Sequence, residues 1–156
     1  MTARDYSLLR SYFQDAYSHN SFVKLLRMKL VRVEPGMAEL KMPIDPATHT
    51  NLFGVSHGGS LASIADTVMG VACASLGRRV VTLDLNVNFI KAAAADTEVR
   101  AIGRVVHNGR QTLVAECDVI GVEERLLGKA RGTFFVVGQF DIPEEILKNV
   151  DRSGTN

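Results

Sequence analysis

The apolar segment at residues 57–76 is the feature that most constrains how this 156-residue chain can fold. It contains no proline, and its larger apolar residues recur at helical spacing, which predicts one long helix. The remaining residues are nearly all small or apolar, so we expect this helix to be buried on every side. A single carboxylate, Asp66, lies in the middle of it.

Small residues share the helical face of Asp66. At about 100° per residue, these are Gly59, Ala62, Ser63, Gly70 and Cys73. Such a face leaves room for close approach, yet an ionised carboxylate is costly to bury unless it is paired, hydrogen-bonded or hydrated. Two interpretations of Asp66 therefore remain open. It is either a structural aspartate that caps a backbone or pairs with an arginine, or a catalytic acid or base in a cleft.

Most of the chain outside this helix has strand-like character. Residues 81–89 alternate strictly between apolar and polar side chains, the clearest period-two pattern in the sequence. Turn residues at 34–36 and at Asn108-Gly109 predict hairpins. The predicted strands are 28–33, 37–42, 81–89, 96–107, 110–120 and 125–137. A buried helix needs a surface to cover it, so we expect an α+β fold in which one curved antiparallel sheet wraps around the helix.

Shorter elements are expected at both ends and before the central helix. Residues 4–18 predict an N-terminal helix, and residues 22–26 a second helical turn that Ser21 would cap. A polar loop at 43–56 leads into the central helix. The segment 138–156 is predicted to be a polar tail with a short helix at 143–150 and a frayed end.

Composition indicates a single soluble domain over residues 1–156, with its core at 28–137. The net charge of +1 and the lack of a basic stripe argue against a nucleic-acid partner. No apolar run is long enough to span a bilayer, and no signal-peptide core is seen, so we expect no membrane partner and a cytoplasmic location.

Cys73 and Cys117 lack metal-type spacing and are expected to be buried hydrophobes. No metal or cofactor is predicted.

The motif before and within the central helix resembles a known family. It runs Asn51-x-x-Gly54-x-x-His57-Gly58-Gly59, with Asp66 seven residues after Gly59 and Thr82-x-Asp84 on the following strand. This pattern is similar to the signature of hotdog-fold acyl-CoA thioesterases of the phenylacetate-degradation type. The resemblance covers residues 28–137 and implies a hotdog fold, a curved antiparallel sheet around a long central helix.

The resemblance also implies catalytic roles. The backbone N–H of Gly58 would donate to the thioester carbonyl at the positive end of the helix dipole. Asp66 would act as nucleophile or as general base towards water, and Asn51 would orient the carbonyl or the water. Thr82 stands where the family often has serine and would help to hold the water. The alternatives are a tight loop at Gly58 and an ordinary strand residue at Thr82.

Further residues at the helix entrance and the strand ends are expected to bind substrate. Phe53 would touch the acyl chain, and Lys91 and Arg110 would meet the coenzyme A phosphates unless they are ordinary solvated charges. His57 and Gly59 would shape the substrate loop, with His57 acting structurally through a hydrogen bond. The other histidines, His19, His49 and His107, show no partner pattern and are interpreted as surface or loop residues.

The implied activity is hydrolysis of an aryl- or short/medium-chain acyl-CoA to the free acid and coenzyme A. The alternatives are a non-catalytic acyl-CoA binding module and a hotdog hydratase or dehydratase. Gly58 and Asp66 are separated by about 12 Å along one helix, too far to act on one carbonyl. We therefore expect a homodimer whose sites combine residues of both chains, which in the family often doubles to a dimer of dimers.

Overall fold

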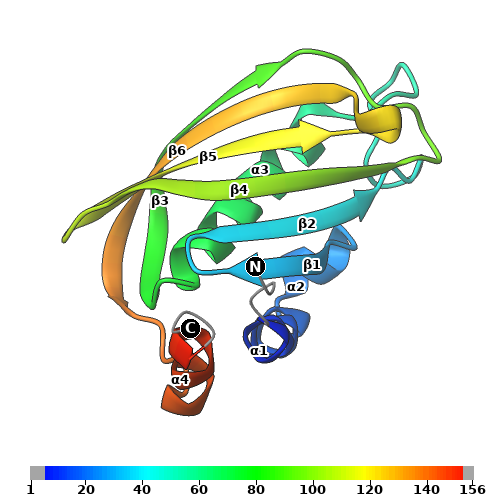
Figure 1. Ribbon diagram of the computed structural model, residues 1–156. Helices are drawn as coiled ribbons and strands as arrows, with labels where there is room; N and C mark the ends of the chain where they lie inside the picture. The colour runs from blue at the N-terminus through cyan, green and yellow to red at the C-terminus, as the bar shows by residue number, and fades with distance from the viewer. Residues whose placement is uncertain (1–5, 153–156) are drawn as a thin grey trace.

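The computed structural model describes residues 6–152, and side chains for residues 6–148. Residues 4–5 of the predicted N-terminal helix and residues 153–156 of the predicted frayed end lie outside this range. One six-stranded antiparallel sheet curves around the central helix α3 (Gly58–Ala74), in the strand order β1-β2-β4-β5-β6-β3 (Figure 1). The predicted α+β architecture is confirmed.

The observed elements lie close to the predicted ranges. The strands are β1 (Lys29–Glu34), β2 (Met37–Pro43), β3 (Arg78–Phe89), β4 (Glu98–Asn108), β5 (Thr112–Ile120) and β6 (Leu126–Gln139). The other helices are α1 (Ser7–Ser18), α2 (Ser21–Leu25) and α4 (Glu144–Arg152), with a short 3-10 helix η1 (Val122–Glu124) between β5 and β6. No helix within residues 6–152 is long and apolar enough to cross a membrane.

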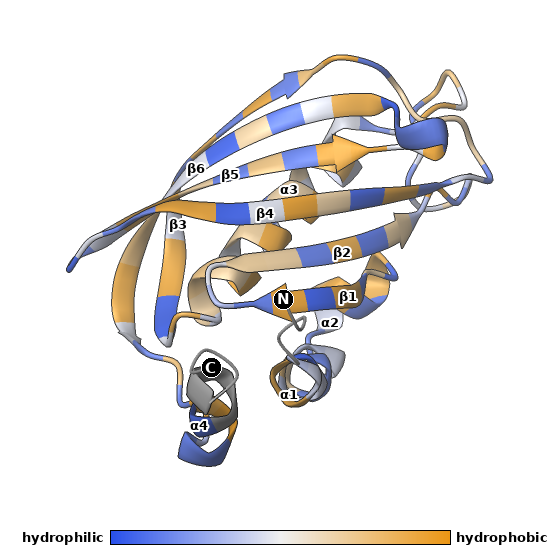
Figure 2. Ribbon diagram, viewed as in Figure 1, coloured by the Kyte–Doolittle hydropathy of each residue, from blue (hydrophilic) through white to orange (hydrophobic). Residues whose placement is uncertain are grey.

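The core lies between α3 and the concave face of the sheet. Side chains along each strand alternate between the two faces, which produces the alternating bands on the sheet in Figure 2. The helix approaches β4 closely at Gly103, where a Cβ atom would lie 3.0 Å from the backbone of Val68. A side chain at position 103 would therefore push the helix away from the sheet.

The central helix is not buried on every side, contrary to the prediction. Its larger residues, such as Ile64 and Val68, face the sheet and are fully buried. The side chains around Asp66 are only partly covered, because the sheet wraps one side of the helix and leaves the other open. These half-open residues are Ala62, Ser63, Asp66, Thr67 and Gly70. Cys73, which the helical wheel placed on the same face, is completely buried.

The strand predicted at residues 81–89 is confirmed as part of β3, but a bulge interrupts the regular alternation of its two faces. Thr82 pairs with Phe134 and Asp84 with Thr133, which leaves Leu83 without a partner across the strand pair. The extra residue reverses the alternation. Thr82 therefore shares the face of the buried Phe134, towards α3, whereas regular alternation from Leu85 would have turned it outward.

The two ends of the chain pack together beside the sheet. The ring of Phe13 in α1 stacks on Phe140 with ring centres 5.2 Å apart, and the hydroxyl of Tyr12 donates to the carbonyl of Asp141. Ile142 and Ile146 are buried in the main core. The C-terminal segment, expected to be polar, thus contributes apolar side chains. Figure 1 shows α1 below β1, and α4 to its left, below the lower ends of β6 and β3.

The cap of α2 differs from the prediction by one residue. Asn20, not Ser21, is the N-cap, and its side-chain oxygen accepts from the backbone N–H groups of Phe22 and Val23. Ser21 is the first helical residue. Both residue types cap helices well, so the sequence pattern located the helix start without distinguishing the two neighbours.

Candidate active site

Asp66 is held by Thr82 within the same chain. The hydroxyl of Thr82 donates to Oδ1 of Asp66 at 2.8 Å. The other carboxylate oxygen, Oδ2, has no hydrogen-bond partner among the described residues, and no described lysine or arginine pairs with this carboxylate. This excludes, for residues 6–148, the structural interpretation in which Asp66 pairs with an arginine. An oriented carboxylate with one free oxygen on a half-open face can accept a proton or attack an electrophile.

A free backbone donor lies at the start of the same helix. His57 is the N-cap of α3, and its Nδ1 accepts from the N–H of Gly59 at 2.8 Å. The N–H of Gly58 has no acceptor among the described residues. Because the first N–H groups of a helix are unpaired and carry its positive dipole end, Gly58 can stabilise an oxyanion. The N–H of Gly59 is not available to a ligand while it donates to Nδ1 of His57.

An aromatic ring that the sequence did not single out covers Gly58. A Cβ atom built on Gly58 would lie 3.3 Å from Cζ of Phe89, the last residue of β3. Phe89 is 54 % exposed. It therefore offers an apolar surface directly beside the free N–H. Only the tertiary arrangement brings the end of β3 to the start of α3, so no local sequence signal could have identified Phe89.

Asn51 holds the loop before α3 in shape. Its Oδ1 accepts from the backbone N–H of Phe53 at 2.9 Å and of Val55 at 3.4 Å. The amide nitrogen of its side chain has no acceptor among the described residues and can still donate to a ligand. Phe53 extends from the loop tip and is 87 % exposed. Within one chain it therefore contacts little of the site.

His49, interpreted from the sequence as a surface or loop residue, lies in the loop before α3, but it is completely buried rather than at the surface. Its Nδ1 accepts from the N–H of Asp45 at 3.1 Å, and its Nε2 lies 2.9 Å from the carbonyl oxygen of Leu26. A polar loop at 43–56 suggested exposure, but this loop folds back so that the imidazole satisfies two backbone groups. A lone histidine in a polar segment carries no signal of such a role.

The two predicted phosphate ligands lie at opposite ends of the sheet. Lys91 follows β3 and bonds through its backbone N–H to Leu127, at the end where Phe89 covers Gly58. Arg110 lies in the β4–β5 hairpin, whose Gln111 bonds to Val136 near the start of β3. At about 3.3 Å per residue, the 12 residues of β3 separate the two ends by roughly 36 Å along the strand. One chain therefore brings Lys91, but not Arg110, towards Gly58.

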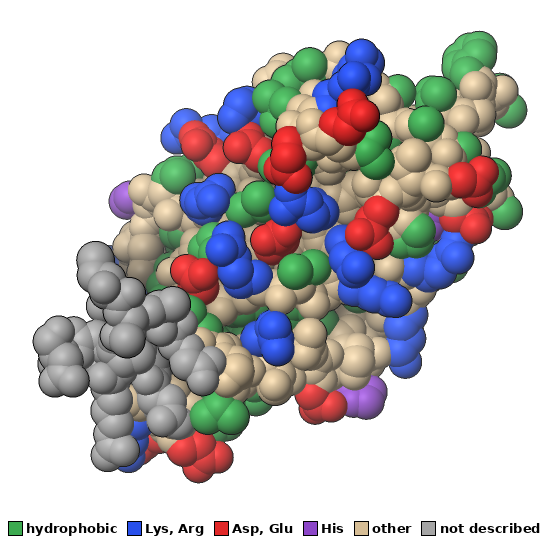
Figure 3. Space-filling view, turned by 45° about the vertical axis from the view of Figure 1, so that its right-hand side comes forward, with side chains coloured by type: hydrophobic (Ala, Val, Ile, Leu, Met, Phe, Trp, Pro, Cys, Tyr) green, Lys and Arg blue, Asp and Glu red, His purple; other side chains and the backbone are tan. Residues whose placement is uncertain are grey.

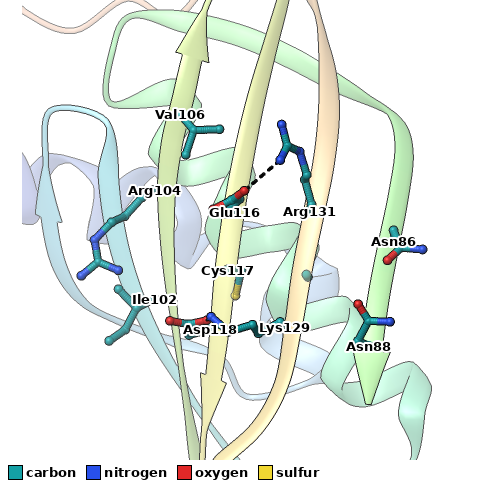
Figure 4. A pocket seen from close by; sticks show the side chains of 11 residues that line it. Asn86, Asn88, Ile102, Arg104, Val106, Glu116, Cys117, Asp118, Lys129 and Arg131 are labelled. Atoms are coloured by element: carbon teal, nitrogen blue, oxygen red, sulfur yellow. Dashed lines mark hydrogen bonds and ion pairs between the residues drawn. The ribbon is translucent and has the colours of Figure 1, made fainter. Parts of the chain in front are cut away.

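A hollow of about 280 Å³ lies on the outer face of the sheet, away from α3 (Figure 4). Its charged side chains largely neutralise each other. Arg131 bonds to Glu116 at 3.0 Å, and Lys129 bonds to Asp118 at 2.6 Å. Acidic and basic side chains are interspersed over this side of the molecule (Figure 3). None of the predicted site residues lines the hollow, so the candidate active site lies on the α3 side.

The two cysteines are poorly suited to nucleophilic chemistry. Both are free and buried. Burial raises the pKa of Cys73 and that of Cys117 to about 12. A thiol is a nucleophile only when it is deprotonated, so neither cysteine competes with Asp66 for that role at neutral pH.

The sequence and the structure match known thioesterases. Residues 53–127 match the family model for the Thioesterase superfamily. Acyl-coenzyme A thioesterase PaaI of Escherichia coli K12 is 27% identical over 122 residues, which cover 78% of this chain and 86% of that protein. The solved E. coli PaaI structure superposes with a TM-score of 0.78 at 24% identity, covering 86% of this chain and 95% of that one.

Two further relatives are more similar in sequence over shorter stretches. Proofreading thioesterase EntH of Klebsiella pneumoniae is 35% identical over 101 residues, covering 63% of this chain and 72% of that protein. A hypothetical thioesterase from Streptococcus pneumoniae TIGR4, solved with coenzyme A, is 32% identical with a TM-score of 0.70, covering 73% of this chain and 91% of that one. Fold and relatives together define a hotdog-fold thioester hydrolase. The chain belongs to the thioesterase superfamily and is of the PaaI type within it.

Proposed function

We propose that this enzyme hydrolyses an aryl- or short/medium-chain acyl-CoA to the free acid and coenzyme A. The Asp66 carboxylate carries the proposal, because Thr82 orients one of its oxygens and the other is free on a half-open helix face. Named relatives with acyl-coenzyme A thioesterase activity, and the relative solved with coenzyme A, support this substrate class. The exposed ring of Phe89 supports an apolar acyl or pantetheine group beside Gly58.

In the proposed mechanism the thioester carbonyl accepts a hydrogen bond from the N–H of Gly58, while Asp66 attacks the carbonyl carbon or deprotonates a water that does so. The hydroxyl of Thr82 keeps the carboxylate aligned, and the side-chain amide of Asn51 donates to the carbonyl or to the water. Negative charge that develops on the carbonyl oxygen is stabilised by the helix N-terminus. The C–S bond then breaks, and the thiolate of coenzyme A leaves and takes up the proton removed from the water. If water attacks directly, this step gives the free acid. If Asp66 attacks, it leaves a mixed anhydride, which a water molecule hydrolyses to release the acid and restore the carboxylate.

The proposed site is shared between two chains of a homodimer. Gly58 and Asp66 are about 12 Å apart along α3, whereas a donor and a base for one carbonyl must each lie within about 3 Å of the reacting atoms. An antiparallel partner helix would bring its own Asp66 beside Gly58. With the two β3 strands side by side and antiparallel, the β4–β5 hairpin of the partner would lie at the end of the sheet where Lys91 lies. This would bring Arg110 of the partner subunit near Lys91. A second pairing of such dimers gives the proposed tetramer.

The exposed edge of the sheet supports this dimer. Strand β3 is an outermost strand of the sheet, and its residues Val81 and Leu83 are 50 % and 59 % exposed. An uncovered apolar edge strand invites pairing with another strand. The open face of α3 beside it consists of small residues, which allows a second helix to approach closely.

The geometry favours hydrolysis over the two alternatives. A hydratase or dehydratase of this fold would use a histidine base, but Nδ1 of His57 is occupied by capping the helix. A non-catalytic binding module has no need for a carboxylate with an oriented and a free oxygen beside the thioester. Both alternatives therefore leave the Asp66–Thr82 pair without a role.

The test is a hydrolysis assay over a panel of aryl- and aliphatic acyl-CoA substrates, with Asp66→Asn as the inactive variant. Asp66→Asn keeps the size and removes the charge, and we expect a fall in kcat of about a hundredfold or more. Asp84→Asn, two residues beyond Thr82 on the exposed face, is the matched control. Full turnover by a folded Asp66→Asn protein would remove Asp66 from the mechanism. No turnover of any acyl-CoA by the unmodified protein would overturn the proposed substrate class.

A further inference from the structure

An open hollow, here called the α2–α3 hollow, lies between α2 and the first turn of α3. Its volume is about 290 Å³. Phe22 and Leu26 line it on the side of α2, and His57, Gly59 and Ser63 line it on the side of α3. Ligand pockets range from about 300 to 1,000 Å³. The hollow can therefore hold one group of a ligand, but not a whole acyl-CoA.

The α2–α3 hollow adjoins the free backbone donor of the candidate active site. Gly58 lies between His57 and Gly59 in the chain, and both of these neighbours line the hollow. Ser63, which also lines it, is one of the half-open residues on the helical face of Asp66. A thioester whose carbonyl accepts from the N–H of Gly58 would therefore have the hollow directly beside its carbonyl carbon.

The hollow and the ring of Phe89 lie on different sides of Gly58. A Cβ atom on Gly58 would point at Phe89, whereas Ser63 lies about 140° further around α3 at about 100° per residue. The acyl group and the sulfur of a thioester leave the carbonyl carbon in different directions. Lys91 follows β3 on the Phe89 side, so pantetheine and the coenzyme A phosphates fit that side. The acyl group then points into the hollow.

The lining of the hollow favours an uncharged acyl group. None of the described residues that line it is a lysine or an arginine. The hydroxyls of Thr50, Ser60 and Ser63 each donate to a backbone carbonyl of the same chain. Their oxygens can still accept, but their protons are already used. A carboxylate on the acyl group would thus lose water without gaining a cation or a hydroxyl donor from these side chains.

We propose that the α2–α3 hollow binds an uncharged acyl group of the thioester and that Phe22 limits the size of this group. The inference rests on the proposed hydrolysis and assigns the acyl end of the same site. The wall is held in place, because Nε2 of His49 in the loop before α3 lies 2.9 Å from the carbonyl oxygen of Leu26. Since α2 lies outside residues 53–127, which match the family model, this size limit belongs to the N-terminal segment of this chain.

Hydrolysis of butanoyl-, hexanoyl- and decanoyl-CoA by two variants of Phe22 tests the size limit. Phe22→Ala should raise the ratio of kcat/KM for decanoyl-CoA to that for butanoyl-CoA about fivefold, and Phe22→Trp should lower it about fivefold. The reason is that a hydrophobic pocket discriminates by the methylenes that it can hold. Opposite shifts in the two variants distinguish a size limit from a loss of structure, and a thermal melt checks that both fold.

Glutaryl-CoA tests the expected preference for an uncharged group. It has nearly the length of hexanoyl-CoA but ends in a carboxylate. We expect its kcat/KM to be at least about tenfold lower than that of hexanoyl-CoA, because the carboxylate would lose water without a cationic partner. Equal turnover of the two substrates would overturn the assignment of an uncharged acyl group to the hollow.

Leu25→Ala is the matched control. Leu25 is another exposed apolar residue of α2, but it does not line the hollow, so its removal should leave the chain-length preference unchanged. Inhibition by free coenzyme A, which has no acyl group, should be the same in all three variants. A preference that Leu25→Ala changes as much as Phe22→Ala does would overturn the role of Phe22.

A binding measurement separates this inference from the proposed hydrolysis. Calorimetric titration with 2-oxoalkyl analogues of butanoyl- and decanoyl-CoA, which keep the carbonyl but cannot be hydrolysed, should show the same opposite shifts in the Phe22 variants. If binding shifts in this way but no thioester is turned over, the hollow is supported and the hydrolysis is wrong. If thioesters are turned over but neither Phe22 variant changes the preference, the hydrolysis is supported and the size limit is wrong. Failure of both the binding and the turnover overturns both.

Discussion

The Nε2 atom of His49 lies 2.9 Å from the carbonyl oxygen of Leu26, which joins the loop before α3 to the N-terminal helices. Since Nδ1 accepts from the N–H of Asp45, the neutral ring must donate through Nε2. The carbonyl of His49 also accepts from the N–H of His57 and from the hydroxyl of Ser60. One buried residue therefore connects α2, the loop and the first turn of α3, where the Gly58 donor lies.

Replacing His49 by alanine is expected to lower the free energy of unfolding by about 2–4 kcal/mol, because it leaves a cavity and removes the partner of one buried and one partly buried backbone group. Denaturant unfolding measures this. His19→Ala, which removes an exposed histidine, is the control and should change stability by less than about 0.5 kcal/mol. Equal stability of the two variants would show that the buried imidazole does not hold the loop.

Thr82→Val removes the hydroxyl that orients Asp66 and keeps the shape of the side chain. We expect kcat to fall about tenfold while KM stays nearly constant, because alignment of the carboxylate matters most in the transition state. Thr82→Ser keeps the hydroxyl and should restore most of the activity. If Thr82→Val is as active as Thr82→Ser, the hydrogen bond to Asp66 has no catalytic role.

Mixing two inactive variants tests whether the site is shared. Asp66→Asn chains and Asn51→Ala chains should each be nearly inactive as homodimers. After subunit exchange, a heterodimer holds one intact site and one doubly damaged site, so up to about half of its sites should regain activity. Exchange is followed by native mass spectrometry. Confirmed exchange without recovery, or an active monomer, would show that each chain carries a complete site.

Alanine substitution of Lys91 and of Arg110 tests the phosphate contacts. Each change should raise KM for acyl-CoA severalfold with little change in kcat, because contacts with the distant phosphates are the same in ground and transition state. An acyl-pantetheine substrate, which lacks these phosphates, should be unaffected. Arg104→Ala, on the outer face of the sheet, is the control. An unchanged KM for acyl-CoA in both single variants would make these residues ordinary surface charges.

Stability is expected to fall at alkaline pH. Burial raises the pKa of Cys73 and of Cys117 from 9.0 to about 12. Above pH 9 the unfolded chain releases these protons and the folded chain keeps them, so the stabilisation present below pH 9 is lost progressively up to pH 12. Each thiol contributes a slope of about 1.4 kcal/mol per pH unit. Urea unfolding at pH 8 to 11 measures how the free energy of unfolding falls with pH, and Cys73→Ala should remove the contribution of one thiol to this slope. A flat profile would contradict the expected thiol ionisation.

The architecture could be predicted because its signals are periodic and long. The apolar spacing in residues 57–76 identified α3, and alternation identified the strands that cover it. The motif around Gly58 and Asp66 then indicated the chemistry. The predicted roles of the site residues themselves remain predictions that the variants above can test.

What could not be predicted depends on single residues whose effect appears only in three dimensions. The helical wheel treats all directions around α3 as equal, whereas the sheet covers only one side and leaves Asp66 half open. Asn20 and Ser21 are both good caps, so composition could not choose between them. Phe89 and His49 reach their positions through contacts between distant segments, which no local pattern contains.

The unpaired Leu83 determines which face of β3 carries Thr82. Because a strand presents alternate residues to alternate faces, pairing Leu83 in a regular ladder would turn Thr82 away from Asp66 without changing any functional group. A related chain with the same motif but no bulge at this point of a strand of the same length would therefore lose the hydrogen bond between the two side chains. The orientation of the Asp66 carboxylate depends on one unpaired residue in the edge strand as much as on the chemistry of the side chains.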